Sequence, residues 1–193
     1  MSDPVLHLVA GPNGAGKTTL HRRVIEPATH LLFINADLIA HDRWPGEELG
    51  HAYEAAAIAA AARAECLAQR QSFATETVFS HPSKIALLQS AADVGYRTYL
   101  HIVLIPEALA VARVAQRVAG GGHQVPQDKV RGRFARLWGH LAVAIEVVNE
   151  ARVYDNTDPR TPLRLIATYI DGQRAGTPEW PAWVPDELRT AGH

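Results

Sequence analysis

The sequence predicts an α/β fold in one domain, with a parallel sheet covered by helices on both faces. Three observations favour it. Short apolar runs alternate with helical segments along the chain, its 193 residues fit one domain, and its 47% hydrophobic content supplies a sizeable core. We expect residues 1–193 to form a single domain, with a lid over about 107–140 and an irregular C-terminal tail over about 175–193.

The first half of the chain alternates strands and helices. Residues 5–10 form a β-branched and leucine-rich run that stops at a Gly-Pro-Asn-Gly turn, as a buried strand does. A helical pattern covers residues 16–25 and is expected to end near Pro27. Residues 31–34 predict a second strand that ends at Asn35-Ala36-Asp37 before a loop. Ten alanines within residues 52–68 predict one long helix over 47–70, because alanine is the strongest helix former. A third strand is expected over 72–79.

The second half continues the alternation. Residues 83–94 predict a helix that Gly95 ends, and residues 98–105 form the clearest strand of the chain. A helix over 107–119 stops at three glycines, and another is expected to run from Pro126 to about Ala151. The last strand candidates are 153–156 and 165–170. Three prolines and two tryptophans in the tail predict an irregular strap on the surface.

Charge and cysteine usage limit the partners and the compartment. The 19 Lys and Arg residues nearly balance the 20 Asp and Glu, which argues against a long nucleic acid or an anionic membrane as the main partner. The single cysteine, Cys66, excludes an internal disulfide framework and favours a reducing compartment. The chain has no signal-peptide pattern and no apolar run of about 18 residues. We therefore expect a cytoplasmic protein.

The most specific motif lies between the first strand and the first helix. Residues 11–18 match G-x-x-x-x-G-K-[ST], the phosphate-binding P-loop. Its backbone N–H groups and the start of the helix attract phosphate, Lys17 is placed to reach the β- and γ-phosphates, and Thr18 to bind Mg²⁺. The sequence thus predicts ATP and Mg²⁺ as cofactors, held by Gly11, Pro12, Asn13, Gly14, Ala15, Gly16, Lys17, Thr18 and Thr19.

Two carboxylates follow the next two strands and predict the acceptor side. The N-K-x-D and L-S-G-G-Q signals of GTPases and ABC proteins are absent, which favours a small kinase. Asp37 is a candidate general base for an attacking hydroxyl, and the alternative is an aspartate that caps the next turn. Glu76 is a candidate to hold Mg²⁺ or contact the acceptor, and its alternative is a salt bridge at the strand end. Thr77, which follows it, is a further candidate substrate contact.

A basic segment predicts the lid. Residues 113–136 hold six basic residues and one acid, whereas residues 35–54 hold five acids and one arginine. Two arginine-bearing helices around a glycine break suit a lid that supplies positive charge to the moving phosphoryl group, with Arg113 among its ATP contacts. The alternative is a solvated basic face. His123 is a candidate substrate contact, and its alternative is a cap or a packing residue.

Several motifs together resemble the zeta-toxin family of P-loop kinases. These are AGPNGAGKTT, FINAD, TET and RVAGGGHQVPQDKVRGRF, and the resemblance covers about residues 4–170. It implies a three-layer P-loop NTPase fold of the kinase-like type, a central parallel sheet ordered 2-3-1-4-5, and a helical lid. It also implies ATP–Mg²⁺-dependent phosphorylation of a hydroxyl on UDP-N-acetylglucosamine, and a protein antitoxin as partner.

The resemblance also implies roles for single residues. Lys17 and Thr18 would bind ATP and Mg²⁺, Asp37 would be the general base, and Glu76 would bind metal or substrate. Arg117 and Arg133 would contact the phosphates, and Asn156 would lie by the adenine pocket. Longer zeta toxins place an arginine shortly after the base, whereas Leu38-Ile39-Ala40-His41 follows here, and the chain resembles the shorter, compact branch. The open alternatives are another hydroxyl acceptor, such as an antibiotic, a dinucleotide ribose or a polynucleotide end, and a non-catalytic ATP-binding module.

Overall fold

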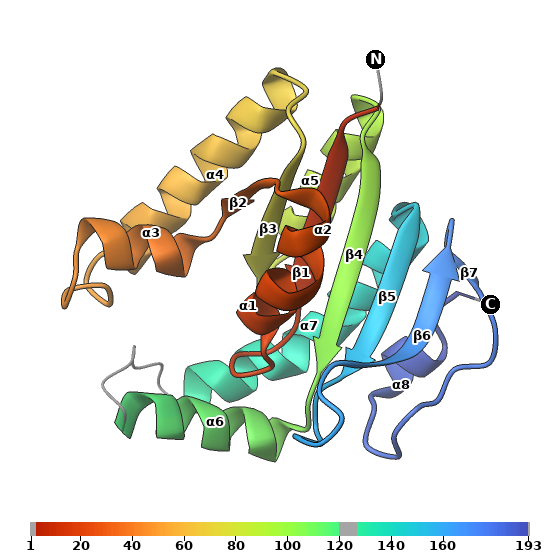
Figure 1. Ribbon diagram of the computed structural model, residues 1–193. Helices are drawn as coiled ribbons and strands as arrows, with labels where there is room; N and C mark the ends of the chain where they lie inside the picture. The colour runs from red at the N-terminus through yellow and green to blue at the C-terminus, as the bar shows by residue number, and fades with distance from the viewer. Residues whose placement is uncertain (1–2, 120–126, 193) are drawn as a thin grey trace.

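A seven-stranded sheet forms the centre of the protein in the computed structural model, which describes residues 3–119 and 127–192 (Figure 1). The strand order is β2-β3-β1-β4-β5-β6-β7. The first five strands run parallel, so the predicted order 2-3-1-4-5 is confirmed, and β6 and β7 extend the sheet as antiparallel strands. The strands are β1 (Val5–Ala10), β2 (Leu32–Ile34), β3 (Phe73–Thr77), β4 (Arg97–Leu104), β5 (Glu150–Asp155), β6 (Arg164–Ile170) and β7 (Gln173–Arg174).

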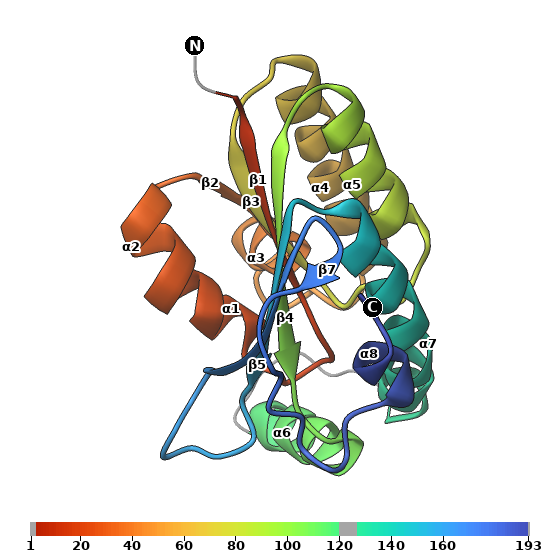
Figure 2. The ribbon, with the colours of Figure 1, turned by 90° about the vertical axis from the view of Figure 1, so that its right-hand side faces the viewer.

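Helices lie on both faces of this sheet. Figure 2 shows α4, α5, α7 and α8 on one face and the rod made of α1, η1 and α2 on the other. The described part of the chain contains no helix long and apolar enough to cross a membrane. The helices are α1 (Lys17–Leu20), the π-helix η1 (His21–Ile25), α2 (Glu26–Thr29), α3 (Ala36–Arg43), α4 (Ala52–Ala68), α5 (Ser83–Asp93), α6 (Glu107–Ala119), α7 (Gln127–Val147) and α8 (Asp186–Arg189).

The alternation of side chains along the strands divides the core in two. Leu6 and Leu8 of β1 point into the larger core, which α4, α5, α7 and α8 cover, whereas Val9 points into the smaller core with Leu20 of α1 and Ala110 of α6. All five side chains are fully buried. Burial on both faces explains why β1 is a nearly continuous apolar run, as is usual for a central strand of a parallel sheet.

Several predicted boundaries differ from the structure, and two of these differences concern the ends of helices. The helix expected to reach Ala151 ends at Val147, because the backbone from Glu150 pairs with β4. Asn149 marks the change, since its Oδ1 accepts hydrogen bonds from the Thr98 backbone N–H (2.9 Å) and hydroxyl (3.2 Å). The helix expected to end near Pro27 continues to Thr29. The π-helix η1 directly precedes α2, and Pro27 stands in the first turn of α2, a position that proline tolerates.

The C-terminal tail is largely irregular, as its composition predicts, but some of its side chains are buried. Val184, Leu188 and Ala191 are buried in the larger core, and the Tyr169 hydroxyl donates to the Leu188 carbonyl oxygen at 3.3 Å. The buried side chains of α7 from Leu137 onward belong to the same core. The predicted lid over 107–140 therefore shares its last residues with the core.

Candidate functional site

The loop between β1 and α1 has a backbone that only glycine adopts readily. Gly11, Gly14 and Gly16 have φ angles of 147°, 76° and 97°, which disfavour any residue with a Cβ atom. A Cβ on Gly11 would lie 2.3 Å from the Val103 carbonyl oxygen of β4. The motif glycines therefore fit the loop closely against the neighbouring strand, at the carboxyl end of the sheet.

Lys17 is folded over this loop. Its side chain is only 9% exposed, and its Nζ donates a hydrogen bond to the Pro12 carbonyl oxygen at 3.1 Å. A buried ammonium beside the loop backbone is a strong local source of positive potential. The predicted phosphate cradle and its lysine thus lie together in one place.

Thr18 and Glu76 meet beside the loop. The Thr18 hydroxyl donates to the Glu76 Oε2 at 2.8 Å, and Glu76 is opposite Val9 in the pairing of β1 with β3. Hydroxyl and carboxylate oxygens fit Mg²⁺, which binds few protein ligands and completes its shell with phosphates and water. Residues 3–119 and 127–192 contain no cluster of three or more His, Cys, Asp or Glu side chains able to hold a metal by themselves. The pair therefore suits a nucleotide-bound Mg²⁺.

Arg113 and Asn156 lie behind the loop and hold its backbone. Arg113 donates to the carbonyl oxygens of Gly14 (3.3 Å) and Asn156 (3.0 Å). The Asn156 Nδ2 donates to the Ala15 carbonyl oxygen at 2.7 Å, and its Oδ1 accepts from the Leu163 backbone N–H at 3.2 Å. The structure thus brings these two predicted cofactor residues to the P-loop as supports of its shape.

Asp37 lies in the first turn of α3, a helix that replaces the predicted loop after β2. Asn35 begins this helix, since its Oδ1 accepts hydrogen bonds from the backbone N–H groups of Asp37 (2.8 Å) and Leu38 (3.4 Å). Asparagine is a favoured N-cap residue, so Asn35 is the signal that would have predicted α3. Asp37 itself is exposed and makes no ion pair with any described residue. Its carboxylate is available at the carboxyl edge of the sheet.

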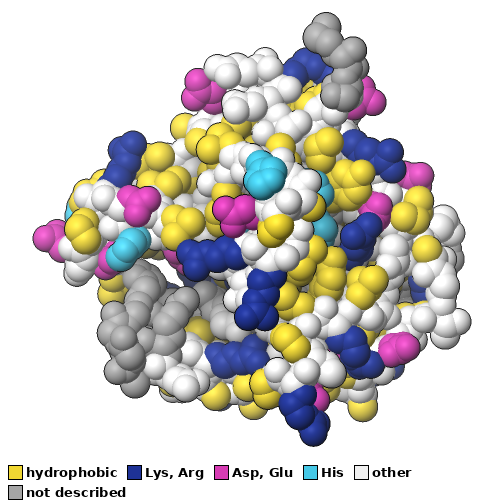
Figure 3. All heavy atoms as spheres, in the orientation of Figure 1, with side chains coloured by type: hydrophobic (Ala, Val, Ile, Leu, Met, Phe, Trp, Pro, Cys, Tyr) yellow, Lys and Arg dark blue, Asp and Glu magenta, His cyan; other side chains and the backbone are white. Residues whose placement is uncertain are grey.

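The other predicted contacts are arranged around this edge. Thr19 is exposed on α1, and the Thr77 hydroxyl oxygen accepts from the Phe79 backbone N–H at 3.2 Å. Figure 3 shows Lys and Arg side chains gathered in the lower half of this face, where Figure 1 places α1 and α6. The edge is therefore positively charged on the side of the P-loop.

The lid arginines differ in how they are held. Arg133 of α7 is half-buried, whereas Arg131 is exposed and forms an ion pair with Glu107 of α6 at 2.7 Å between Nη1 and Oε1. Arg117 belongs to the last turns of α6. His123 lies outside the described residues. Of Arg131 and Arg133, Arg133 is thus the one without a carboxylate partner among the described residues.

Two histidines, one on β1 and one on the neighbouring strand β4, form a pair outside this site. The His7 Nδ1 and the His101 Nε2 are 3.0 Å apart, and His101 is 4% exposed. Burial, with smaller contributions from neighbouring charged groups, lowers the pKa of His7 to about 4 and that of His101 to about 3. Both imidazoles are therefore neutral at physiological pH, and one donates its N–H to the other.

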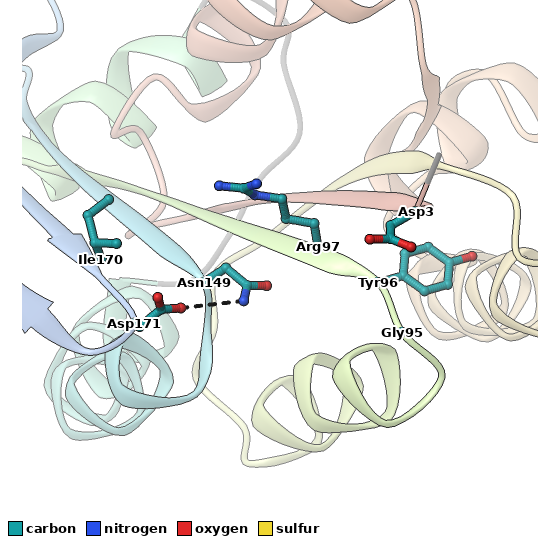
Figure 4. A pocket seen from close by; sticks show the side chains of 7 residues that line it. All are labelled: Asp3, Gly95, Tyr96, Arg97, Asn149, Ile170 and Asp171. Atoms are coloured by element: carbon teal, nitrogen blue, oxygen red, sulfur yellow. Dashed lines mark hydrogen bonds between the residues drawn. The ribbon is translucent and has the colours of Figure 1, made fainter. Parts of the chain in front are cut away.

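A shallow pocket lies at the opposite edge of the sheet. Figure 4 shows Asp3, Arg97, Asn149 and Asp171 around it, with the Asn149 Nδ2 3.5 Å from the Asp171 Oδ1. Arg97 begins β4, whereas the P-loop follows the end of β1, which runs parallel to β4. This pocket is therefore remote from the phosphate cradle.

Comparison with protein families matches residues 6–148 to the AAA domain family AAA_33. The chain belongs to this family. The match includes the P-loop, Asp37, Glu76 and the α6–α7 segment, so this AAA domain has the P-loop kinase-like α/β fold that its strand order displays. No curated protein matches the sequence significantly.

Solved structures share this fold at low sequence identity. A chain of the AvrRxo1-ORF1:AvrRxo1-ORF2 complex, solved with sulphate ions, superposes with a TM-score of 0.72 at 16% identity over 93% of this AAA domain. This AAA domain spans 66% of that chain. The PezAT toxin–antitoxin system of Streptococcus pneumoniae gives 0.57 at 14% identity, covering 80% and 69% of the two chains. Shikimate kinase from Acinetobacter baumannii gives 0.52 at 16% identity, covering 80% and 85%.

Proposed function

We propose that the protein is an ATP-dependent kinase that transfers the γ-phosphate to a hydroxyl group of a small molecule. The observation that carries the proposal is the hydrogen bond between Thr18 of the P-loop and Glu76 of β3, at the sheet edge where Asp37 is exposed. A phosphate-binding motif, a hydroxyl–carboxylate pair of the kind that suits Mg²⁺ and an exposed carboxylate at the same edge of the sheet together support the proposal. A structural neighbour solved with ATP supports the choice of nucleotide.

Each group has a role in phosphoryl transfer. Lys17 and the P-loop N–H groups hold the β- and γ-phosphates, and Thr18 with Glu76 would hold Mg²⁺, which neutralises charge on the phosphate oxygens. Asp37 accepts the proton of the acceptor hydroxyl while the oxygen of that hydroxyl forms a bond to the γ-phosphorus. The bond from that phosphorus to the β–γ bridging oxygen breaks, and ADP leaves. Arg117 and Arg133 stabilise the charge on the transferring group.

The acceptor we propose first is UDP-N-acetylglucosamine, in a reaction of the zeta-toxin type. The P-loop, FINAD, TET and GGHQVP motifs support it, and so does the likeness of fold to a toxin–antitoxin system. A protein antitoxin that blocks the phosphate site is the matching partner. Among the alternatives, the fold shared with shikimate kinase supports another small molecule with a hydroxyl group as the phosphate acceptor.

The test is a search for the compound that gains a phosphate group. Purified protein is incubated with ATP, Mg²⁺ and a small-molecule cell extract, with UDP-N-acetylglucosamine alone as the first sample, and the products are compared by mass spectrometry. We expect one hydroxyl compound to gain phosphate with the wild type. Asp37→Asn should bind ATP normally but transfer about 10²–10⁴-fold more slowly. If no compound gains phosphate while ATP is bound, the proposal is wrong.

A further inference from the structure

Two bulky apolar residues at the carboxyl edge of the sheet adopt the left-handed backbone conformation that normally favours glycine. They are Phe79, which follows β3 with a φ of 65°, and Leu163, which precedes β6 with a φ of 56°. The other positive-φ residues besides glycine in the described part of the chain lie at helix ends or in the β6–β7 turn, where they are common: His30, Arg70 and Asp171. Strained residues without such a local reason cluster at functional sites.

Phe79 connects the core to the end of β3. Its backbone N–H donates to the Thr77 Oγ1 at 3.2 Å, and Thr77 is the last residue of that strand. Thr77 pairs with Ala10, which directly precedes the P-loop. Glu76, which accepts the hydrogen bond from the Thr18 hydroxyl, directly precedes Thr77. The left-handed turn is therefore tied by one hydrogen bond to the strand end that carries the candidate metal carboxylate.

Burial of the ring keeps Phe79 in this conformation. The side chain is fully buried in the larger core, together with Leu88 of α5 and Leu137 of α7. A left-handed conformation is unfavourable for an L-amino acid, because Cβ approaches the following carbonyl oxygen, and it persists only where the surroundings over-determine it. The apolar surface that the ring removes from water offsets this strain, so the chain turns sharply and β3 ends at Thr77.

The metal makes the position of this strand end important. Mg²⁺ demands near-ideal octahedral geometry, so its protein ligands have to be held accurately. Thr18 belongs to α1 and Glu76 to β3, so their relative position depends on how firmly the last residues of β3 are held. We propose that Phe79 is a positioning residue for this pair, acting through Thr77 on the Glu76 carboxylate. The inference rests on the proposed kinase function and gives a role in metal binding to a side chain that lies in the core.

The test measures how much Mg²⁺ strengthens nucleotide binding. The affinity for AMP-PNP is determined by isothermal titration calorimetry with Mg²⁺ and again with EDTA, and the ratio of the two affinities gives the contribution of the metal. Thr77→Val removes the oxygen that accepts from Phe79 and should lower this ratio about 10-fold, as expected for a lost charged contact, with the affinity in EDTA unchanged. Phe79→Ala should lower the ratio equally. Thr77→Ser, which retains the hydroxyl, should keep it.

Phe73 provides a matched control. It is also a fully buried phenylalanine of the larger core, and it begins the same strand. Phe73→Ala should lower the midpoint of urea unfolding as Phe79→Ala does, but it should leave the Mg²⁺ ratio at the wild-type value. Glycine variants test the backbone directly. At position 79 glycine should have an unfolding constant smaller than that of alanine by about 3-fold or more, whereas at position 73, where φ is not positive, alanine should be the more stable.

Several results would overturn the inference. They are an unchanged ratio in Thr77→Val or in folded Phe79→Ala, an equal fall of the ratio in Phe73→Ala, and a wild-type affinity that does not depend on Mg²⁺. Thr77→Val preserves the shape of its side chain and the core, so it remains informative if loss of the Phe79 ring unfolds the protein. AMP-PNP binding requires no acceptor and no transfer, so these failures are distinct from an absence of kinase activity. A wild type that does not bind AMP-PNP would overturn both proposals.

Discussion

Replacing Asn156 with alanine should weaken the ATP site, although Asn156 lies behind the P-loop. The change removes the hydrogen bond from Nδ2 to the Ala15 carbonyl oxygen (2.7 Å) and the one that Oδ1 accepts from Leu163 (3.2 Å). At about 1 kcal/mol each, these bonds contribute about 2 kcal/mol to the free energy of unfolding. Arg113 still holds Gly14, so we expect ATP affinity to fall by about 10-fold, which corresponds to about 1.4 kcal/mol.

A matched set of variants makes this prediction specific. Asn156→Asp puts a carboxylate against the Ala15 carbonyl oxygen and should lose more ATP affinity than Asn156→Ala, whereas Arg160→Ala, on the exposed loop after β5, should lose none. ATP affinity is measured by isothermal titration calorimetry, and stability by urea unfolding. Equal ATP affinity in the wild type and both Asn156 variants would show that the loop does not need this support, and would refute the reasoning.

Three further predictions concern the charges of the site and of the sheet. Lys17→Ala should reduce phosphate transfer by about 10²-fold or more in a steady-state assay with labelled ATP, and an unchanged rate would remove the P-loop from the mechanism. Glu76→Gln should raise the Mg²⁺ concentration needed for half-maximal transfer, and an unaltered Mg²⁺ titration would exclude Glu76 from the metal site. Because the folded-state pKa of His101 is lowered to about 3, the unfolded state binds the proton more tightly, and stability is lost as pH falls below the unfolded value of about 6.5. Between about pH 7.5 and about pH 5 this costs about 2 kcal/mol for His101 in urea unfolding, and His101→Phe should remove that part of the pH dependence.

Local patterns in the sequence predict the sheet and the phosphate cradle well. The run over residues 5–10 is apolar because β1 is buried on both faces, and Gly11, Gly14 and Gly16 are required by positive φ angles within a few residues of one another. Such features depend on neighbours in the chain, so their residue types reveal them. The strand order follows from the resemblance and is confirmed.

Features that depend on distant residues are the ones that the sequence does not reveal. Asn156 contacts Ala15 across 141 positions, and Arg63 approaches Thr75 from another element, so no local pattern indicates either contact. The end of α7 at Val147 is set by pairing of the next strand with β4, against a helical pattern that continues. The tail illustrates the same point, because Leu188 is buried only through packing on the larger core.

The proposed antitoxin would act at the P-loop edge of the sheet. A protein that covers the P-loop would exclude ATP, so a competition experiment with AMP-PNP tests this mode once a partner is isolated. The proposed blocking of the phosphate site requires competition with AMP-PNP.

The most direct test of the account is the transfer of labelled γ-phosphate from ATP to UDP-N-acetylglucosamine by the wild type and by Asp37→Asn. ATP affinity is measured on the same preparations. The account predicts labelled sugar nucleotide with the wild type, a rate about 10²–10⁴-fold lower with Asp37→Asn, and equal ATP affinity for the two proteins. Equal transfer rates would contradict the assignment of Asp37 as the base. No transfer by the wild type to this compound or to any compound of a cell extract, with ATP bound, would contradict the assignment of the protein as a kinase.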